Sequence, residues 1–361
     1  MSDWQQKNQR NKALVWDFWQ RMNHAGYDEI PALINRFFHR DIDWNGSQPI
    51  NQLRGPEAVS SGFWQPLKQS FPDIKRTADI FMGGRPYDLS DGVEWVSGTG
   101  YLTGTFDKDW LGIPATGKKT NIRFGQFYMI RDDKIVESYL ILDTIAVINQ
   151  AGFRVLPPSL GADGGKVLAP WGRDGVLLAE QDETETLKTM QLTTAMGAGM
   201  SRYISARDKE NLNTMGQQHY WDPDFHWYGP SGIGASHNLE EYQDFHQRPW
   251  LTGFGDRDVW KQADPGGRIM AFTGEGQFAG GGIWDVKFSR HNGEYLNIPA
   301  TGKMMTMRDF DWYKRDGEVL TQNWVPIDMI DLLMQMDINL FDRMRHQIDQ
   351  RKRGQAQARR S

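Results

Sequence analysis

The chain has 361 residues, of which 39% are hydrophobic and 12% aromatic, and it carries a net charge of −5. This length and composition allow two domains with separate cores and exclude a disordered chain. The negative charge argues against nucleic acid as a partner. The absence of Cys excludes disulfides, thiolate metal sites and a Cys nucleophile. With a polar start and no run long enough to span a bilayer, we expect a cytoplasmic protein that contacts no membrane.

The first 151 residues are predicted to form helices and then strands. Apolar residues spaced i, i+3, i+4 predict a helix over residues 12–22, and further helices are expected at 28–38 and 55–67. Runs of β-forming residues predict the strands, at 41–45, 75–82, 93–105, 120–131 and 134–142. A helical turn is expected at 144–150.

Residues 152–180 are rich in Gly and Pro and lack a period, which indicates a linker. The order of elements then repeats in a second domain, residues 181–350. The elements expected there are helices at 183–205, 239–245 and 327–348, and strands at 225–228, 259–261, 268–278, 304–313 and 319–325. The basic tail, residues 351–361, is predicted to be disordered and solvated.

A repeated hexapeptide relates the two domains. The sequence IPATGK occupies residues 113–118 and again 298–303, an offset of 185 (298 − 113). Three further pairs share this offset: Asp143 and Asp328, Tyr128 and Tyr313, Arg123 and Arg308. Asp43-Trp44 corresponds to His226-Trp227 at an offset of 183 (226 − 43). The shared order predicts a tandem duplication of one domain, because the period far exceeds that of a solenoid unit.

Helices followed by antiparallel strands predict an α+β fold in each half. A curved sheet wrapped around helices leaves a conical pocket, which is a usual place for a ligand. We expect each half to enclose an apolar pocket, edged by the aligned residues Asp43, Trp44, His226 and Trp227.

The late part of each half resembles the SnoaL-like polyketide cyclase family of the nuclear transport factor 2-like superfamily. The resemblance rests on the turn PATGK at 114–118, the hairpin sequence DKIVESY at 133–139 and Asp143. In the second half it rests on 299–303, 316–319, 322–324 and Asp328. It implies a cone-shaped antiparallel sheet around helices. The His-Trp pair of many relatives is replaced by Ser138-Tyr139 and Asn323-Trp324, so no His role carries over at this position.

Three residues are candidate catalytic groups. The resemblance implies that a late Asp acts as acid and base in an intramolecular aldol closure, and Asp143 and Asp328 match that position. An Asp in an apolar pocket becomes a stronger base. His226 could shuttle a proton near neutral pH. The alternatives are that both Asp residues cap the helices that follow them, and that His226 is a partly buried, hydrogen-bonded His.

The other candidate site residues are polar or aromatic side chains expected on strands or near the pocket. They are Asp43, Trp44, Trp227, Arg123, Arg308, Tyr128, Tyr139, Trp324 and His237. The alternative to a role in the pocket is core packing for the aromatic residues and solvent exposure for the two arginines. The histidines 219, 237 and 246 match no metal-ligand spacing, and no cofactor motif is present. We therefore expect neither a metal nor a cofactor.

These features favour a cofactor-free cyclase or isomerase that acts on a carbonyl-bearing, polyketide-like or other apolar small molecule. The alternatives are a protein that only binds such a molecule, and a dimerisation scaffold. If one half alone is catalytic, we expect it to be the second, because His226 stands where the first half has Asp43.

The two halves are expected to pack sheet to sheet as an intramolecular pseudo-dimer. The linker is long enough to allow this and raises the effective concentration of one half around the other. Along strand 319–325, one alternate set of side chains should face the pocket and the other the partner sheet. The C-terminal helix could support a larger homo-oligomer.

Overall fold

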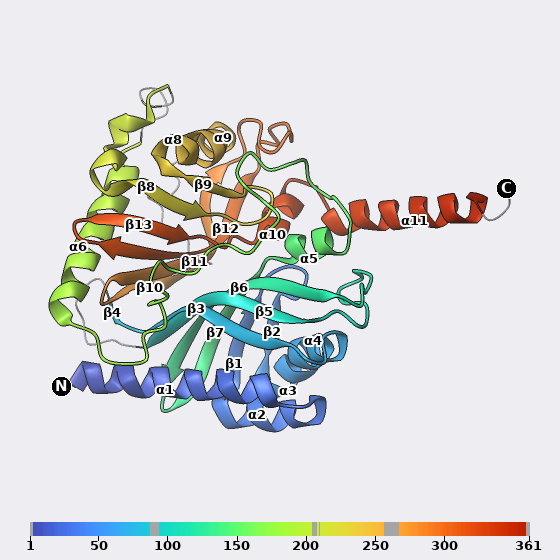
Figure 1. The fold of residues 1–361 in the computed structure, drawn as a ribbon, viewed down its shortest axis with the longest axis horizontal. Coiled ribbons are helices and arrows are strands. Elements are labelled where there is room, and N and C mark those ends of the chain that lie inside the picture. The colour runs from blue at the N-terminus through green and yellow to red at the C-terminus, as the bar shows by residue number, and fades with distance from the viewer. Residues whose placement is uncertain (1–2, 87–93, 204–207, 209, 256–266, 359–361) are drawn as a thin grey trace.

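The computed structural model describes residues 3–86, 94–203, 208, 210–255 and 267–358. Two curved sheets lie against each other in the middle of the molecule, and helices cover them on the outside (Figure 1). The strand predicted at 259–261 lies outside the described residues. So do residue 93 of a predicted strand, 204–205 of a predicted helix and 359–361 of the tail.

The first half begins with helices that pack on one face of its sheet. They are α1 (Asp3–His24), the 3-10 turn η1 (Tyr27–Glu29), α2 (Ile30–Phe37), α3 (Gly55–Val59), the π-helical turn η2 (Ser60–Trp64) and α4 (Gln65–Ser70). The helix α5 (Thr144–Gln150) follows the last strand. The apolar stripe of α1, with Val15, Phe18, Trp19 and Met22, is buried against the sheet. Burial of this stripe is the main reason that the helix is stable there.

The first sheet has six strands in the order β2-β1-β7-β6-β5-β3. Their bounds are β1 (Phe38–Gly46), β2 (Gln52–Arg54), β3 (Lys75–Met82), β5 (Trp95–Thr105), β6 (Lys119–Arg131) and β7 (Lys134–Leu142). Strands β1 and β7 run parallel, and the other neighbours are antiparallel.

The second sheet repeats this order as β9-β8-β13-β12-β11-β10, again with one parallel pair, β8 and β13. Its strands are β8 (Trp221–Tyr228), β9 (Ala235–His237), β10 (Arg268–Glu275), β11 (Phe278–Arg290), β12 (Met304–Asp316) and β13 (Val319–Trp324). A short strand of the first half, β4 (Arg85–Pro86), pairs with β10 and extends this sheet. The sheet of one half is therefore completed by the chain of the other.

The helices of the second half also precede most of its strands. They are α6 (Glu183–Met200), η3 (Leu212–Met215), η4 (Gln217–His219), α8 (Asn238–Tyr242), the π-helical turn η5 (Gln243–Gln247), α9 (Arg248–Gly253), α10 (Met329–Gln335) and α11 (Leu340–Ala358). The π-helical turns η2 and η5 begin 183 residues apart (243 − 60), the same offset as Trp44 and Trp227. A π-helical turn is rare, so its recurrence supports a local correspondence between the halves.

Each sheet has an inner face, toward the helices of its own half, and an interface side, toward the other sheet. Side chains alternate between the two along a strand. On β12, Met305, Met307 and Tyr313 join the core with the helices, whereas Phe310 and Trp312 join a second cluster. That second cluster contains residues of both sheets, so apolar burial holds the halves together.

Close contacts fill the space between the sheets. Phe127 of β6 packs against Phe310 and Trp312 with ring centroids 4.9 and 5.3 Å apart. The indole Nε1 of Trp312 donates a hydrogen bond to Ser97 Oγ at 3.1 Å. Gly125 lies so close to the second sheet that a Cβ atom there would sit 2.7 Å from Cγ of Pro326.

Four features differ from the sequence predictions. The segment predicted as one strand over 268–278 is β10 and the first residue of β11, separated by a turn at Gly276, and β11 then runs on through residues that were left unassigned. The short strands β2, β4 and β9 were not predicted. The single helix expected at 327–348 is divided into α10 and α11 at Asp337, which has a positive φ of 66°. Residues 351–358 of the tail continue α11 rather than being disordered.

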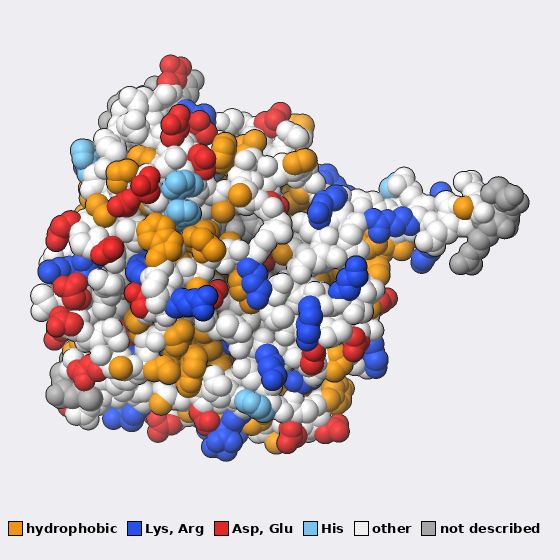
Figure 2. All heavy atoms as spheres, in the orientation of Figure 1, with side chains coloured by type: hydrophobic (Ala, Val, Ile, Leu, Met, Phe, Trp, Pro, Cys, Tyr) orange, Lys and Arg blue, Asp and Glu red, His pale blue; other side chains and the backbone are white. Residues whose placement is uncertain are grey.

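Two segments lie outside the sheets and the helices that cover them, namely the linker and α11. Residues 152–179 contain no helix or strand of their own and cross the front of the molecule in Figure 1. The linker exposes Leu160, Leu168, Trp171 and Leu178. Helix α11 projects from the body and carries several Lys and Arg side chains (Figure 2). Among the described helices, none combines the length and the apolar composition needed to cross a bilayer.

Candidate functional site

The predicted catalytic carboxylates, Asp143 and Asp328, lie where the two halves meet. Each is the N-cap of a helix: Asp143 Oδ1 accepts a hydrogen bond from the N–H of Ala146 at 2.9 Å, and Asp328 Oδ1 accepts one from Asp331 at 3.2 Å. Each also binds the opposite half through Oδ2. Asp143 Oδ2 accepts from the N–H and hydroxyl of Ser231 at 3.0 and 2.8 Å, and Asp328 Oδ2 from the N–H of Gln48 at 2.9 Å.

These two contacts are reciprocal. The acceptors are 185 residues apart (328 − 143) and the donors are 183 apart (231 − 48), so each half contributes the same kind of carboxylate and the same kind of loop. This is the arrangement that a two-fold interface between identical subunits would have. Burial raises the pKa of Asp143 and raises that of Asp328 to about 7, against the opposing effect of Arg308 in the second case.

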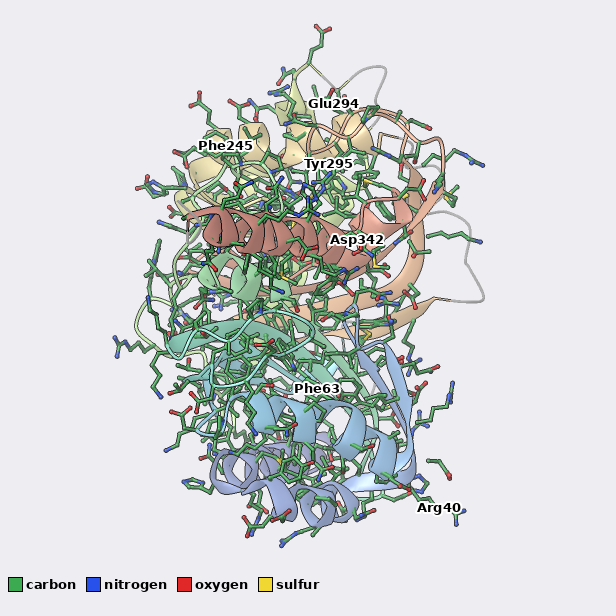
Figure 3. The ribbon with its side chains drawn as sticks, turned by 90° about the vertical axis from the view of Figure 1, so that its right-hand side faces the viewer. Arg40, Phe63, Phe245, Glu294, Tyr295 and Asp342 are labelled. Carbon is green, nitrogen blue, oxygen red and sulfur yellow. The ribbon has the colours of Figure 1, made fainter. Side chains whose placement is uncertain are left out.

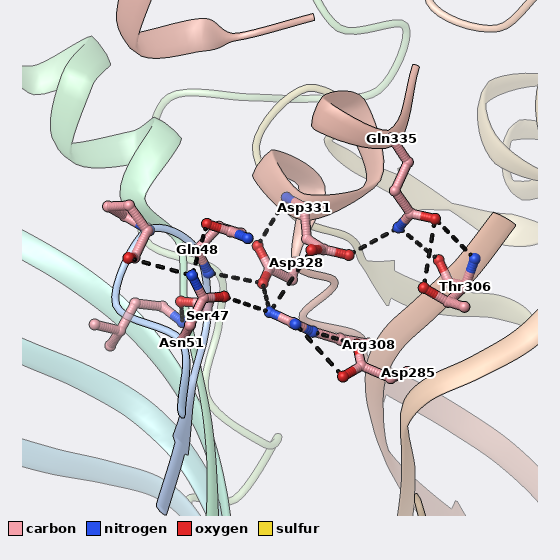
Figure 4. A network of polar contacts seen from close by, with 11 residues as sticks. Ser47, Gln48, Asn51, Asp285, Thr306, Arg308, Asp328, Asp331 and Gln335 are labelled. Carbon is pink, nitrogen blue, oxygen red and sulfur yellow. Dashed lines mark hydrogen bonds and ion pairs between the residues drawn. The ribbon is translucent and has the colours of Figure 1, made fainter. Parts of the chain in front are cut away.

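The two aligned arginines also join the halves. Arg123, which is buried, donates to the backbone oxygens of Gly229 and Tyr228 at 2.7 and 2.9 Å. Arg308 donates to Asp285 at 2.7 Å, to Asp328 at 3.2 Å and to Asn51 of the first half at 3.3 Å (Figure 4). Neither guanidinium points into the inner face of a sheet, so both contribute to the contact between halves.

The remaining predicted residues fall into three places. Trp44 and Trp227 are buried on the inner faces, where Trp44 packs on Phe63 and Trp227 stacks on His246. Tyr128 is also on the inner face. Tyr139 and Trp324 lie in the cluster between the sheets.

Asp43, His226 and His237 lie away from both interiors. Asp43 accepts a hydrogen bond from Gln52 at 2.7 Å. The rings of the half-buried His226 on β8 and the exposed His237 on the edge strand β9 stack 4.4 Å apart. Burial lowers the pKa of His226, and the neighbouring His237 adds to that effect.

A polar cluster that the sequence reasoning missed occupies the inner face of the second sheet. Asp309 and Asp311 are two residues apart on β12, so their side chains point to the same face, as does Tyr313. Both carboxylates are partly buried. Asp311 Oδ1 accepts from the side-chain amide of Asn323 at 3.1 Å, whereas Oδ1 of Asp309 is enclosed and accepts no hydrogen bond.

The first half has apolar or uncharged residues at the matching positions. At an offset of 185, Phe124 corresponds to Asp309 and Gln126 to Asp311. At the same offset, Phe106 corresponds to His291 and Trp110 to Tyr295. At an offset of 183, Phe63 corresponds to His246. Figure 3 shows Phe63 on the helices of the first half and Tyr295 in the second half. Polar groups in an interior cost stability unless they are hydrogen-bonded, and such costs are typically tolerated at functional sites, so this difference marks the second half. The sequence feature that could have indicated this cluster is the alternation of Asp with aromatic residues along the strand, in Asp309-Phe310-Asp311-Trp312.

Protonation distinguishes the two carboxylates of this cluster. Burial and the neighbouring Asp311 raise the pKa of Asp309 well above its ordinary value. Burial raises the pKa of Asp311 to about 6, opposed by hydrogen bonds from Asn323 and Tyr313. The pKa of Asp309 is thus raised by its neighbour as well as by burial, whereas hydrogen bonds oppose the rise for Asp311, and a difference of this kind suits separate acid and base roles.

The inner face of the first sheet holds a narrow pocket instead of an acidic pair. Its free volume is about 10 Å³, and it lies between α1, η2 and β3, next to Trp64, Lys68 and Arg76. A wider hollow of about 420 Å³ adjoins it on the surface, and the two share Asn23 and Lys68.

Comparison with known proteins gives a family match for the first half. The model of a family described as SnoaL-like polyketide cyclase matches residues 16–151. A solved structure from Jannaschia sp. CCS1, described as SnoaL-like polyketide cyclase, is 17% identical, with 42% of this chain and 95% of that chain covered and a TM-score of 0.35. Two further solved structures are described as polyketide cyclases. IdmH from Streptomyces antibioticus is 17% identical, with 40% of this chain and 99% of that chain covered and a TM-score of 0.33. A protein from Xanthomonas campestris is 20% identical, with 40% of this chain and 98% of that chain covered and a TM-score of 0.34. No curated protein sequence matches the chain.

Proposed function

We propose that the second half catalyses general acid–base chemistry of the cyclase or isomerase type on a carbonyl-bearing small molecule. The observation that carries this proposal is the partly buried pair Asp309 and Asp311, whose pKa values are raised to different extents. The first half, which matches the family model, has Phe124 and Gln126 at these positions. The proposal therefore divides the chain into a catalytic half and a half without an acidic pair.

The proposed reaction begins with proton abstraction by Asp311. Its ionised carboxylate takes a proton from the carbon next to the substrate carbonyl, and the bonding electrons move to the carbonyl oxygen to give an enolate. Protonated Asp309 donates its proton to that oxygen, which prevents a buried negative charge from building up. The enol carbon then attacks a second carbonyl of the same molecule, whose oxygen takes the proton held by Asp311, or the carbon itself is reprotonated by Asp311. In either case Asp309 recovers the enol proton, so both carboxyl groups return to their starting states. Asn323 and Tyr313 hold Asp311 in place by hydrogen bonds.

Proton abstraction can be tested without knowledge of the natural substrate. We would measure exchange of the α-protons of 1-tetralone in deuterated water by nuclear magnetic resonance, with and without the protein. The Asp311→Asn variant should lose about 10²–10⁴-fold in rate, the usual contribution of a positioned base. The rate should rise with pH around the pKa of Asp311, which is about 6.

The matched control is Asp316→Asn, at the exposed end of the same strand, which should exchange protons at the wild-type rate. Equal rates in wild type and Asp311→Asn would refute this assignment. Tight binding of carbonyl compounds with no exchange would instead support the alternative of a binding protein.

A second assignment gives the acid–base role to Asp328, Asp143 and His226. The observation in its favour is that Asp328 is buried, that its pKa is raised to about 7 and that Arg308 lies next to it. The Asp328→Asn and Asp143→Asn variants distinguish the two assignments in the same exchange assay. If the carboxylates only cap helices and join the halves, their replacement by Ala should lower the free energy of unfolding by about 1–3 kcal/mol each and leave exchange unchanged.

We also propose that the chain is a tandem duplication, with domains 1–151 and 181–350 joined by the linker 152–180 and followed by the basic tail, residues 351–361. In this proposal the domains form an intramolecular pseudo-dimer. The reciprocal contacts of Asp143 and Asp328 and the shared cluster between the sheets support it. Small-angle scattering of the whole chain should give one compact particle of monomer mass. Two separated lobes would contradict the proposal.

A further inference from the structure

A buried arginine in the first half has no negatively charged partner among the residues that the structure describes. Arg76 lies on the inner face of β3 with 8% of its surface exposed. Its Nη1 donates to the hydroxyl of Tyr128 at 3.2 Å, whereas its Nη2 is enclosed and has no hydrogen-bond partner. No ion pair joins Arg76 to a carboxylate of the described residues.

Aromatic rings enclose the guanidinium. Its central carbon lies 4.3 Å from the ring centre of Trp19 and 4.5 Å from that of Phe124. Cation–π contacts of this kind recover part of the cost of desolvation. They do not satisfy the free N–H groups, and an arginine has five donors and no acceptor. A cation that is buried without a counter-ion costs several kcal/mol, so its retention suggests a role other than folding.

Two more donors surround the same pocket. The indole Nε1 of Trp64 is buried and has no hydrogen-bond partner. Lys68 lies at the point where the pocket meets the surface hollow, and burial lowers its pKa. The rest of the pocket wall is largely apolar, with Met22, Ile30, Ile74 and Leu102.

We propose that this pocket binds the carboxylate group of a small organic acid. The carboxylate would accept hydrogen bonds from Arg76 Nη2 and Trp64 Nε1, and the apolar part of the acid would lie toward the surface hollow. A planar carboxylate suits this site because a guanidinium recognises it with strong, charge-assisted hydrogen bonds. The inner pocket, of about 10 Å³, has room for about one water-sized group, such as one carboxylate oxygen, whereas the hollow of about 420 Å³ falls within the range of ligand sites.

This site is distinct from the proposed catalytic cluster. It is in the other half of the chain, it is cationic rather than acidic, and Phe124 at its base corresponds to Asp309 in the second half. The described residues place Arg76 in one interior and Asp309 and Asp311 in the other, so each interior could bind a different molecule. The acid site therefore does not depend on the reaction proposed above.

The experiment compares an acid with its neutral amide. Calorimetric titration at low ionic strength would use 3-phenylpropionate and 3-phenylpropanamide as probes with the whole chain. We expect the wild-type protein to bind the acid at least tenfold more tightly than the amide, because the amide cannot neutralise Arg76. Equal affinities, or no binding of the acid at millimolar concentration, would overturn the proposal.

Variants then assign the effect to the pocket. Arg76→Gln should weaken binding of the acid at least tenfold. Trp64→Phe, which keeps the ring and removes the N–H, should weaken it several-fold. The control Arg131→Gln removes an arginine from the exposed end of β6 and should not change the affinity. Wild-type affinity in a folded Arg76→Gln variant would overturn the proposal.

Thermal unfolding separates a binding role from a structural one. Because Arg76 lacks a counter-ion, Arg76→Gln should keep or raise the melting temperature without ligand, and should lose the rise in melting temperature that 3-phenylpropionate gives the wild type. A large loss of stability without ligand would assign Arg76 to folding and count against the site. Because Trp64→Phe leaves Arg76 in place, it tests the same pocket even if Arg76→Gln fails to fold.

Discussion

Lys12 of α1 and Glu275 of β10 form an ion pair that connects the two halves across 263 residues. Both side chains are almost fully buried, at 1% and 5% exposure. Glu275 also accepts from Asn8 at 3.0 Å and from the N–H of Gly83 at 2.8 Å, and Lys12 donates to the backbone oxygen of Leu177 at 2.7 Å. One buried charge pair therefore fastens the first helix, the linker and the second sheet together.

Removal of one member of this pair should be strongly destabilising. Lys12→Met leaves the carboxylate of Glu275 buried without its cation, and we expect the free energy of unfolding to fall by about 3–5 kcal/mol. The double variant Lys12→Met/Glu275→Gln should recover much of that loss, since no charge is then left unpaired. Chemical denaturation measures both effects. Arg10→Met, on the exposed side of the same helix, is the control, and an equal loss there would contradict the role of the pair.

The stability of the protein should fall as the pH rises from about 4 to 7. Asp311 and Asp328 have pKa values raised to about 6 and about 7 in the folded state, against an ordinary value of 3.8. The folded protein thus binds these protons more tightly than the unfolded chain. The resulting stability is complete below pH 3.8 and is lost as the pH passes the folded pKa.

For Asp311, the difference between the folded pKa and the ordinary pKa corresponds to at most about 3 kcal/mol in the free energy of unfolding, at about 1.4 kcal/mol per pKa unit. Denaturation curves across this pH range should show a smaller slope for Asp311→Asn than for the wild type. The exposed control Asp316→Asn should keep the wild-type slope. A wild-type slope in Asp311→Asn would show that this carboxyl group does not titrate as expected.

A side chain at Gly125 should push the two sheets apart. A Cβ atom there would lie 2.7 Å from Cγ of Pro326 and 3.1 Å from the rings of Phe310 and Trp312. Overpacking of this kind costs about 1–3 kcal/mol, so Gly125→Val should lower the melting temperature. Gly165→Ala, in the linker where no atom lies within 4 Å of the added carbon, should leave it unchanged. A neutral effect of Gly125→Val would mean that contact between the sheets does not limit stability.

Much of the local structure follows from the sequence, because short-range patterns determine it. The apolar stripe of α1, the alternation along β6 and β12 and the Gly/Pro turns of the repeated hexapeptide all depend on neighbours a few residues away. The capping alternative for Asp143 and Asp328 was available from sequence for the same reason, since an N-cap binds a backbone N–H three residues ahead.

Other features depend on residues far apart in the chain, and only the tertiary structure decided them. Strand β11 is rich in glycine and was missed, yet it pairs with β10 and β12. The rings of Phe272, Phe310 and Trp312 fill the space that side chains at Gly280, Gly281 and Gly282 would take. From the sequence alone, the environments of four aspartates cannot be told apart. They are Asp143, Asp309, Asp311 and Asp328. Their environments differ because burial and hydrogen-bond partners come from other strands and, for Asp143 and Asp328, from the opposite half. The aligned interiors share a backbone plan, but among the described residues one contains Arg76 and the other contains Asp309 and Asp311.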